Sequence, residues 1–444
     1  MILFPDVTKN IVEKTFRPGG AVNLMRLTEE DYKKIPVLQQ VICLCGFLRD
    51  EGPVKLTATG NLPLRIVSAM ESLGVKDWYY ERYPNKLRKE TDSMSVRIAR
   101  ALTEFSGIAR KRSNSLSLTK NGEKIIRDNH LMLMAIIEAY VYKLCIGSFD
   151  GYEDFRIGQY GIGLSLILVD RFGDEPRDSI FYADHYFDVF PYLCKGRSSA
   201  NCYSVRSFER FMLYLGLVNV KENRGSLWSE TTNTITRTDL FKKLISVKSD
   251  LFRMHYSLDA GVKVYQLKIS LCNSEPLIWR RILVPSSVLL SDLHIVIQNC
   301  MGWQNYHLHQ YIKDGNLYSE NTGDDLWKEM NTTDYAGMKL SDLLHGESDS
   351  IIYEYDFGDG WKHNLVVERV LPLDEGVNYP VCTGGEMHCP PEDCGGIPGY
   401  YNMLEVLKNP HHEEYEGYIM WLNGPFDPAA FDIDRVNAVF SGDF

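Results

Sequence analysis

The sequence predicts an α+β protein with a mostly helical N-terminal half and a mixed C-terminal half. Before residue 250 apolar residues recur at helical spacing, as they do in Met94–Phe105. After residue 262 they nearly alternate with polar residues, as in Val264–Cys272, and this pattern is typical of strands. A chain of 444 residues is long enough for at least two domains, and the change of pattern places a boundary near residue 250.

The two halves differ in charge. Residues 1–250 hold 36 Lys and Arg against 30 Asp and Glu, and residues 251–444 hold 12 against 29. The balances of +6 and −17 sum to the −11 of the whole chain. Because a basic surface attracts phosphate and an acidic surface repels it, we expect the halves to have different partners. The alternative for each half is a solvated surface without a partner.

We expect a cytoplasmic protein with no membrane partner. The first residues lack the basic segment, apolar run and cleavage site of a secretory signal. The longest apolar stretch, Leu131–Phe149, is interrupted by Glu138 and Lys143, which favours a buried helix over a membrane span. A reducing compartment also argues against a disulfide framework among the ten cysteines.

A pattern of helix, glycine turn, short strand, polar loop and a further helix recurs three times before residue 250, beginning at Val37, Val96 and Ser207. This is the order of a winged helix, in which a threonine caps the helix after the wing, and Thr119 and Thr236 suit that cap. The predicted domains are therefore tandem winged-helix-like modules in 1–130, and a helical segment followed by a third copy in 131–250. Between the copies, Leu164–Val169 is predicted to be a buried segment after a glycine-rich turn.

Basic residues in these copies indicate a DNA or RNA partner. The loop Ala109–Asn114 of the second copy would be a wing along a phosphate backbone, with the preceding helix near the groove. The candidate contacts are Arg110, Lys111 and Arg112 in this loop, Arg97 and Arg100 on the helix, and Lys221 and Arg224 in the third copy. The alternative is a protein–protein module whose basic loop is only solvated.

The C-terminal half alternates strand and helix signals. We expect strands at 264–272, 279–284, 351–357 and 363–370, and a helix at 289–300 with Ser291 as its N-cap. An Asp-Gly pair in Gly358–Trp361 predicts a hairpin between the last two strands. A further strand, 307–311, would place His307 and His309 on one face.

Four motifs occur in order in this half: Pro276–Arg281, Trp303 with His307–His309, Tyr355–His363, and Cys389–Gly396 with Gly399 and Tyr400. Together they resemble the plasmid pRiA4b ORF-3-like family over about residues 262–440, which defines a domain at 262–444. The resemblance implies a compact, barrel-like α+β domain and a plasmid or mobile-element setting. Although such proteins are often labelled resolvases, nothing here resembles a serine-recombinase core, and the resemblance implies no particular activity.

Three cysteines in a Gly/Pro-rich loop, Cys382, Cys389 and Cys394, suit a structural zinc ion. His363 is the preferred fourth ligand, and His388 is the local alternative. Free thiols packed under the loop are an equally weighted interpretation, and a disulfide is a third.

Carboxylates and imidazoles offer another site. Asp356 and Asp359 could converge with His307, His309 and His363 on a catalytic divalent ion. The competing explanation is that aspartates at a hairpin turn only accept backbone hydrogen bonds.

The leading hypothesis is a non-enzymatic binding protein that contacts nucleic acid through its N-terminal half and a protein partner through its acidic C-terminal domain. A metal-dependent hydrolase or nuclease and a protein-interaction scaffold are the alternatives.

Overall fold

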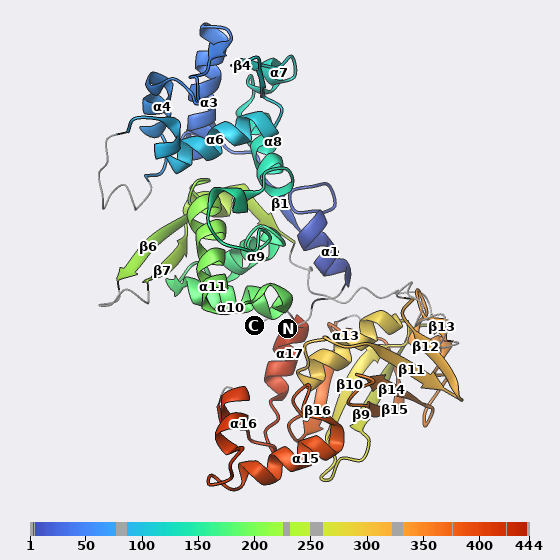
Figure 1. Ribbon diagram of the computed structural model, residues 1–444. Helices are drawn as coiled ribbons and strands as arrows, with labels where there is room; N and C mark the ends of the chain where they lie inside the picture. Colours follow the sequence, from blue (N-terminus) through green and yellow to red (C-terminus); the bar gives the residue numbers. More distant parts are fainter. Residues whose placement is uncertain are drawn as a thin grey trace. The chain divides into compact units, whose positions relative to one another are not determined.

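The structure of the chain is a computed structural model that describes residues 3, 5–76, 87–224, 231–248, 261–321, 332–374, 376–422 and 424–441. Two compact units divide it: one is Asp6–Ser249, and the other is Asp250–Phe444 together with Met1–Pro5. The α+β class is confirmed, because the first unit is mainly helical and the second is built on a large sheet (Figure 1). Within the described ranges, no helix is long and apolar enough to cross a membrane.

The first part of unit Asp6–Ser249 is a helical module closed by a three-stranded sheet. Its elements in chain order are α3 (Pro36–Asp50), β2 (Val54–Lys55), α4 (Leu64–Glu71), α6 (Met94–Phe105), β3 (Ala109–Arg112) and β4 (Ser115–Leu118). The strand order in the sheet is β2-β4-β3, and both pairings are antiparallel. The early strand β2 therefore pairs with the later strand of a hairpin.

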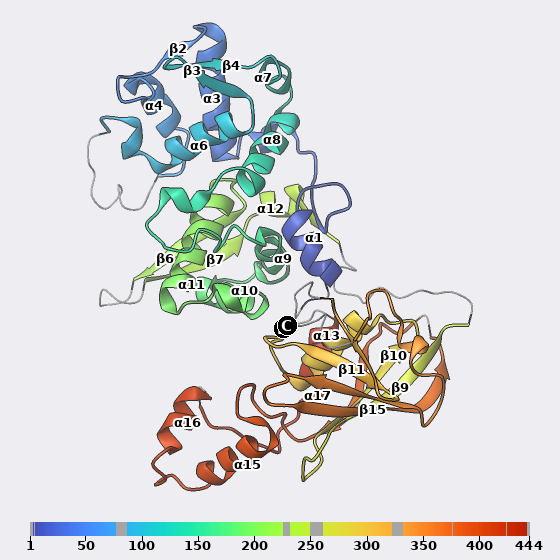
Figure 2. The same cartoon turned by 45° about the vertical axis from the view of Figure 1, so that its right-hand side comes forward.

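A second module follows with the same order. Its elements are α9 (Ile162–Phe172), β5 (Arg177–Asp178), α10 (Ser179–Val189), α11 (Arg197–Ser204) with the π-helix η4 (Val205–Met212), β6 (Val218–Arg224) and β7 (Thr231–Arg237). Its sheet has the order β5-β7-β6, and β6 and β7 form the hairpin (Figure 2). We call these the first and second modules.

The same hydrogen-bonded clasp closes both modules. Gly107 and Gly216 leave their helices with φ angles of +76° and +71°, a conformation that glycine adopts without steric cost. In the first module the hydroxyl of Thr119 donates to the carbonyl of Gly107 at 2.7 Å. In the second module the hydroxyl of Thr238 donates to the carbonyl of Gly216 at 2.8 Å. Each threonine, which follows the second strand of its hairpin, is thus bonded to the glycine turn that precedes the first strand.

The prediction of three copies is therefore wrong. The segments beginning at Val37 and Val96 are two halves of one module, because a two-residue strand such as β2 has no partner within its own half. The segment beginning at Ser207 is the second half of another module, whose first half contains the buried helix α9. Thr236 lies within β7 opposite Asn219, and the N-cap of the next helix is Thr238.

The remaining elements of this unit complete its ends and connections. They are α1 (Pro5–Glu13), β1 (Val22–Leu24), α2 (Glu29–Tyr32), η1 (Glu90–Asp92), α7 (Gly122–Ile125), α8 (Asn129–Tyr142), η2 (Ile146–Phe149), η3 (Pro191–Leu193), α12 (Asp239–Leu244) and β8 (Ile245–Val247). Strand β1 pairs antiparallel with β8, which joins the start of the unit to its end.

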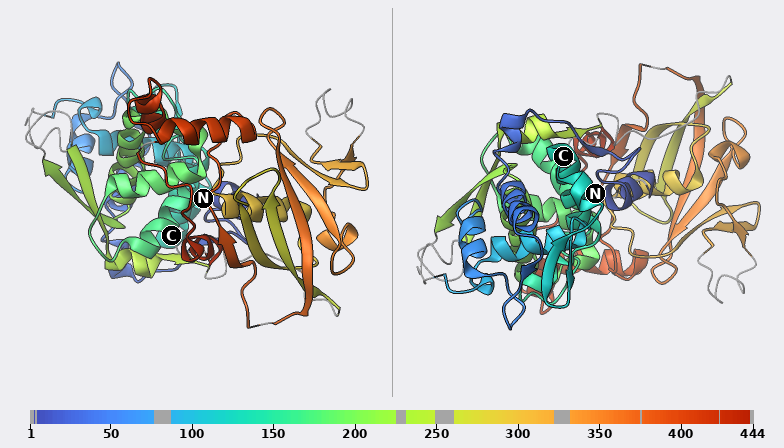
Figure 3. Two further views of the ribbon diagram at one scale, coloured as in Figure 1. Left: turned by 90° about the horizontal axis from the view of Figure 1, so that it is seen from below. Right: turned by 90° about the horizontal axis from the view of Figure 1, so that it is seen from above.

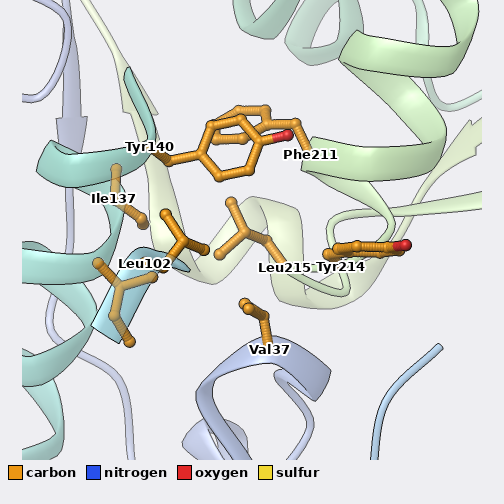
Figure 4. Close-up of a pocket in the computed structure, with 8 residues that line it drawn as sticks. Val37, Leu102, Ile137, Tyr140, Phe211, Tyr214 and Leu215 are labelled. Carbon is orange, nitrogen blue, oxygen red and sulfur yellow. The ribbon is translucent and has the colours of Figure 1, made fainter. Parts of the chain in front are cut away.

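Helix α8 packs both modules into one core. Its Tyr140 donates a hydrogen bond to the carbonyl of Arg210 (2.8 Å), and its ring lies 4.7 Å from that of Phe211. Figure 4 shows the small apolar pocket at this junction, which is lined by Val37, Leu102, Ile136, Ile137, Tyr140, Phe211, Tyr214 and Leu215. Side chains from the first module, from α8 and from the second module therefore line the same pocket.

A buried ion pair holds the loop ahead of α9. The guanidinium of Arg206 donates from Nε and Nη2 to the two carboxylate oxygens of Asp150, at 2.8 and 2.7 Å. The side chains are 0% and 5% exposed. Arg206 Nη1 also donates to the carbonyls of Asp154 and Ile157, at 2.6 and 3.1 Å. This arginine therefore joins Asp150 to two backbone carbonyls of the same loop.

The C-terminal unit is built on one sheet, whose described strands are β9 (Lys263–Leu271), β10 (Trp279–Pro285), β11 (His309–Lys313), β12 (Asn316–Ser319), β13 (Thr333–Asp334), β14 (Ser350–Tyr355), β15 (Trp361–Pro372) and β16 (Val381–Glu386). They lie in the order β13-β12-β11-β14-β15-β9-β10-β16, and only the β12–β13 pair is parallel. Because the outermost described strands do not pair with each other, the sheet is open, and the barrel-like closure expected for this domain is not formed among them.

Helices pack against this sheet and follow it. They are α13 (Leu290–Met301), the short η5 (Leu340–Asp342), α15 (Gly396–Leu407), α16 (Tyr415–Trp421) and α17 (Ile433–Ser441). Figure 3 shows α13 lying along the strands, and its apolar side chains join those of the sheet in one core. Leu289, and not Ser291, is the N-cap residue of α13, because the helix already begins at Leu290.

Replacing Asp150 by alanine should strongly destabilise unit Asp6–Ser249, because the buried guanidinium of Arg206 would lose its counter-charge. We expect a loss of about 3–5 kcal/mol in the free energy of unfolding. The control is Lys242→Ala, which breaks the half-exposed pair with Asp174 (2.7 Å) and should cost less than about 1 kcal/mol. Urea denaturation followed by far-UV circular dichroism measures both, and equal losses would contradict a special role for the buried pair.

Candidate functional site

The hairpin of the first module, formed by β3 and β4, is basic. Arg110, Lys111 and Arg112 lie on β3 and are exposed, and within the described ranges they form no ion pair. Only Ser113 and Asn114 form the turn, with φ angles of +47° and +57°, as in a type I′ hairpin. The predicted loop Ala109–Asn114 is therefore mostly strand, which presents its cations from a defined backbone.

Asn114 fixes the tip of this hairpin. Its side-chain amide donates to the carbonyls of Leu56 and Thr57, at 3.2 and 3.1 Å, and its own carbonyl accepts from the Leu56 amide at 2.9 Å. The loop after β2 therefore supports the hairpin from outside it.

Arg100 is a structural residue, so its assignment to a nucleic-acid contact is corrected. Its side chain is buried and forms ion pairs with Glu90 (2.6 Å) and Glu104 (2.9 Å). It also donates to the carbonyl of Gly60 at 2.9 Å. These partners leave its guanidinium unavailable to a phosphate.

Arg97, Lys221 and Arg224 differ in their surroundings. Arg97 is half-buried on α6, with its guanidinium 5.2 Å from the centre of the Phe149 ring. Lys221 is exposed on β6, at the place that Arg112 has in the first module when both hairpins are counted from their clasps. Arg224 lies on the same strand, but its side chain lies outside the description.

The structure separates the predicted histidines. His309 is the first residue of β11 and lies in the core, where its ring stacks on His294 with 3.5 Å between centroids. His363 is fully buried on β15, with its ring edge-on to Trp303. His307 precedes the strand, so the prediction that His307 and His309 share a strand face is wrong.

The buried histidines are neutral core residues. Burial lowers the pKa of His294 to about 4 and that of His363 to about 3. Burial, and then the neighbouring His294, hold the pKa of His309 well below its ordinary value. The neutral ring of His294 bridges two groups: Nε2 donates to Asn305 Oδ1 and Nδ1 accepts from the Tyr353 hydroxyl, both at 2.8 Å. All three rings are buried, so none of them is accessible to a substrate.

His307 instead meets two carboxylates. Its Nε2 lies 3.6 Å from Oδ2 of Asp356 and 3.2 Å from Oδ1 of Asp393. Asp359 does not join them, because its Oδ2 accepts a hydrogen bond from the Gly395 amide at 3.1 Å. Asp393 is not predicted from the sequence as a site residue, because only the cysteines of the segment Cys389–Gly396 are considered there as ligands. The adjacent carboxylates Glu392 and Asp393 are the feature of the sequence that could have indicated it.

The three cysteines of the proposed zinc loop differ in how deeply they are buried. Cys382 and Cys389 are buried, and Cys394 is half-buried with its thiol pKa raised by burial to about 12. In the described part of the chain, only His307, Asp356 and Asp393 come close enough together to share an ion, so these thiols and His363 do not gather. His388 hydrogen-bonds through Nδ1 to the carbonyl of Cys389 (2.6 Å). Zinc in this loop stays a prediction, and elemental analysis would decide it.

Comparisons with known proteins match the C-terminal unit. The family model for plasmid pRiA4b ORF-3-like proteins matches residues 263–435. An uncharacterized protein, y4hQ of Sinorhizobium fredii, is 35% identical over 176 residues, which cover 39% of this chain and 89% of that protein. The crystal structure of MM3350, a protein of unknown function from Methanosarcina mazei, is 42% identical over 39% of this chain and 96% of that chain, with a TM-score of 0.36.

The family model and y4hQ define the class: the C-terminal unit is an α+β domain of the plasmid pRiA4b ORF-3-like type. The chain belongs to the plasmid pRiA4b ORF-3-like family. The motifs that suggested this family in the sequence supply Trp303, His307, Asp356 and Asp393, so the family resemblance and the polar cluster rest on the same segments.

The buried histidines predict that the C-terminal unit loses stability in acid. A histidine whose folded pKa is depressed stabilises the fold above its unfolded pKa of about 6.5, and this stability is lost as the pH falls toward the folded value. With His294, His309 and His363 neutral when folded and protonated when unfolded, the free energy of unfolding should fall by up to about 4 kcal/mol per pH unit near pH 5.

Denaturant unfolding at several pH values, followed by the fluorescence of the buried Trp303 and Trp361, measures this slope. His294→Gln should reduce it by about 1.4 kcal/mol per pH unit. A stability that does not change between pH 6.5 and 4.5 would contradict the assignment.

Proposed function

We propose that residues 6–249 bind nucleic acid through two winged-helix modules, and that the protein is a non-enzymatic, nucleic-acid-associated member of its family. The observation that carries this proposal is the exposed run Arg110–Arg112 on a hairpin that follows the third helix of a module. In winged-helix proteins that helix enters a groove and the hairpin follows the phosphate backbone. The module order here, helix, strand, helix, helix and hairpin, is the order of a winged helix.

The hairpin suits a phosphate backbone for electrostatic and geometric reasons. Successive side chains of a strand point to opposite faces, so Arg110 and Arg112 share one face and Lys111 projects from the other. The Cα atoms of Arg110 and Arg112 are about 6.6 Å apart along the strand. Guanidinium groups bind phosphate oxygens through paired hydrogen bonds. Because no described acidic residue pairs with these cations, binding a phosphate would break no ion pair that the structure records.

The first module is proposed to make the main contact. Counted from the clasps, the places of Arg110, Lys111 and Arg112 are taken in the second module by Asn219, Val220 and Lys221. The second hairpin therefore offers one cation where the first offers three. We propose that the second hairpin makes a weaker contact with the nucleic acid, or that the second module holds the first module in its orientation.

The acidic C-terminal unit is proposed to bind a protein partner. Residues 251–444 carry a net charge of −17, which disfavours phosphate at their surface. The family is described by a plasmid reading frame, and a plasmid or mobile-element setting is part of this proposal. A scaffold without nucleic-acid contact is the competing function.

The triple variant Arg110→Ala, Lys111→Ala, Arg112→Ala should weaken the binding of duplex DNA by the full chain. Each lost phosphate contact lowers the steepness of log K against log salt by about 0.9, so three contacts lower it by about 3. Gel-shift or anisotropy titrations at several salt concentrations measure this slope.

The matched control removes three exposed cations of the acidic unit, Lys339, Lys362 and Lys408, and changes the net charge equally. It should leave the slope unchanged. If neither variant changes the slope, or if the native chain binds no nucleic acid at low salt, the scaffold function is favoured instead.

A further inference from the structure

Three segments of the C-terminal unit bring an imidazole and two carboxylates to one point. His307 lies just before β11, Asp356 follows the last residue of β14, and Asp393 lies in the loop before α15. The Nε2 of His307 and one oxygen from each aspartate all lie within 4.8 Å of one another. We propose that His307, Asp356 and Asp393 bind a divalent first-row transition-metal ion that keeps open positions for water.

The direction of the imidazole supports a metal over a simple ion pair. The Nε2 atom is shielded from solvent, yet it makes no hydrogen bond with any residue in the described part of the chain. The Oδ1 atom of Asp393 is near enough for a hydrogen bond, at 3.2 Å, so it must lie to the side of the N–H axis, whereas Oδ2 of Asp356 is too distant, at 3.6 Å. An ion with bonds of about 2.1 Å places neighbouring ligand atoms about 3.0–3.4 Å apart; the separation of 3.2 Å lies in this range, and a small movement of the Asp356 side chain would bring the separation of 3.6 Å into it.

Asp356 is prepared to offer one oxygen. Its Oδ1 accepts hydrogen bonds from the amides of Gly358 (2.9 Å) and Asp359 (3.4 Å), and its Oδ2 faces His307. The side chain is only 10% exposed, so this carboxylate is held in place by the turn that follows β14. A fixed carboxylate oxygen is what a metal site requires of its ligands.

The segments are linked to one another independently of any ion. The amide of Asp356 donates to the carbonyl of Leu308 (2.9 Å), which joins the β14 end to the His307 segment. The Tyr355 hydroxyl accepts from the Tyr306 amide at 2.9 Å and donates to Glu392 at 2.5 Å, which joins both to the third loop. Glu392 is therefore a positioning residue beside Asp393.

Access and ligand type indicate the kind of ion. The side chain of Asp393 is 65% exposed and that of His307 is 28% exposed, so one side of the site is open to water. One imidazole nitrogen with two carboxylate oxygens suits Mn²⁺ or Zn²⁺, whereas Ca²⁺ prefers oxygen ligands alone and thiolates select softer ions. With three protein ligands, such an ion keeps positions for water, which distinguishes this site from a closed structural zinc site with four protein ligands.

Mn²⁺ is the probe of choice, because it does not favour the thiols of the cysteine loop. The full chain should bind one Mn²⁺, seen by electron paramagnetic resonance and by titration calorimetry. Asp393→Asn and His307→Ala should each weaken this binding by about tenfold or more. Asn tolerates the left-handed backbone of Asp393 (φ +59°), so this variant should fold.

Asp314→Asn is the matched control, because Asp314 is also exposed, lies in a turn and has a φ angle of +50°. It should bind Mn²⁺ as the native chain does. The proposal is overturned if millimolar Mn²⁺ shows no stoichiometric binding, or if binding is the same in the native chain and both ligand variants. Thermal unfolding without metal shows that each variant is folded. These outcomes do not depend on nucleic-acid binding by residues 6–249.

Discussion

Pairing between a very short strand and a later hairpin determines how residues 6–249 fold. Strand β2 has two residues and β5 has two, and neither can form a sheet with its neighbours in sequence. Each becomes the edge of a three-stranded sheet only when the third helix of its module brings the hairpin back to it. The Thr119–Gly107 and Thr238–Gly216 clasps then fix the hairpin to its helix. The exposed cations of β3 depend on this closure for their direction.

In the C-terminal unit the corresponding constraint is the burial of polar rings in an apolar sheet. His294, His309 and His363 lie in the core, where loss of hydration keeps them neutral, and tyrosines and an asparagine satisfy His294 and His309. The same tyrosine-rich layer reaches the edge of the core through Tyr355, which organises the loops around His307. His294, His309 and His363 are therefore structural core residues, whereas His307, at the edge of the core, belongs to the polar cluster.

The two halves of the chain have different relationships to known proteins. The matched residues 263–435 lie in the acidic unit, and the relative y4hQ that covers them is an uncharacterized protein. The basic hairpin lies in residues 6–249, outside that match. Fold and family therefore say little about activity here, and each proposal rests on the chemistry of named side chains.

Elements with a local sequence signal could be predicted without the structure. Helix Met94–Phe105 and the strands of the β14–β15 hairpin follow from apolar period and an Asp-Gly turn, and the family follows from motifs read in order. Tertiary structure decided the rest, because it depends on groups distant in sequence. Arg100 is neutralised by Glu90 from outside its helix, and β2 finds its partner about sixty residues later. His307 is separated from His309 because β11 begins only at His309. Asp393 lies beside His307 because the loop before α15 brings it there, and sequence spacing could not predict that position.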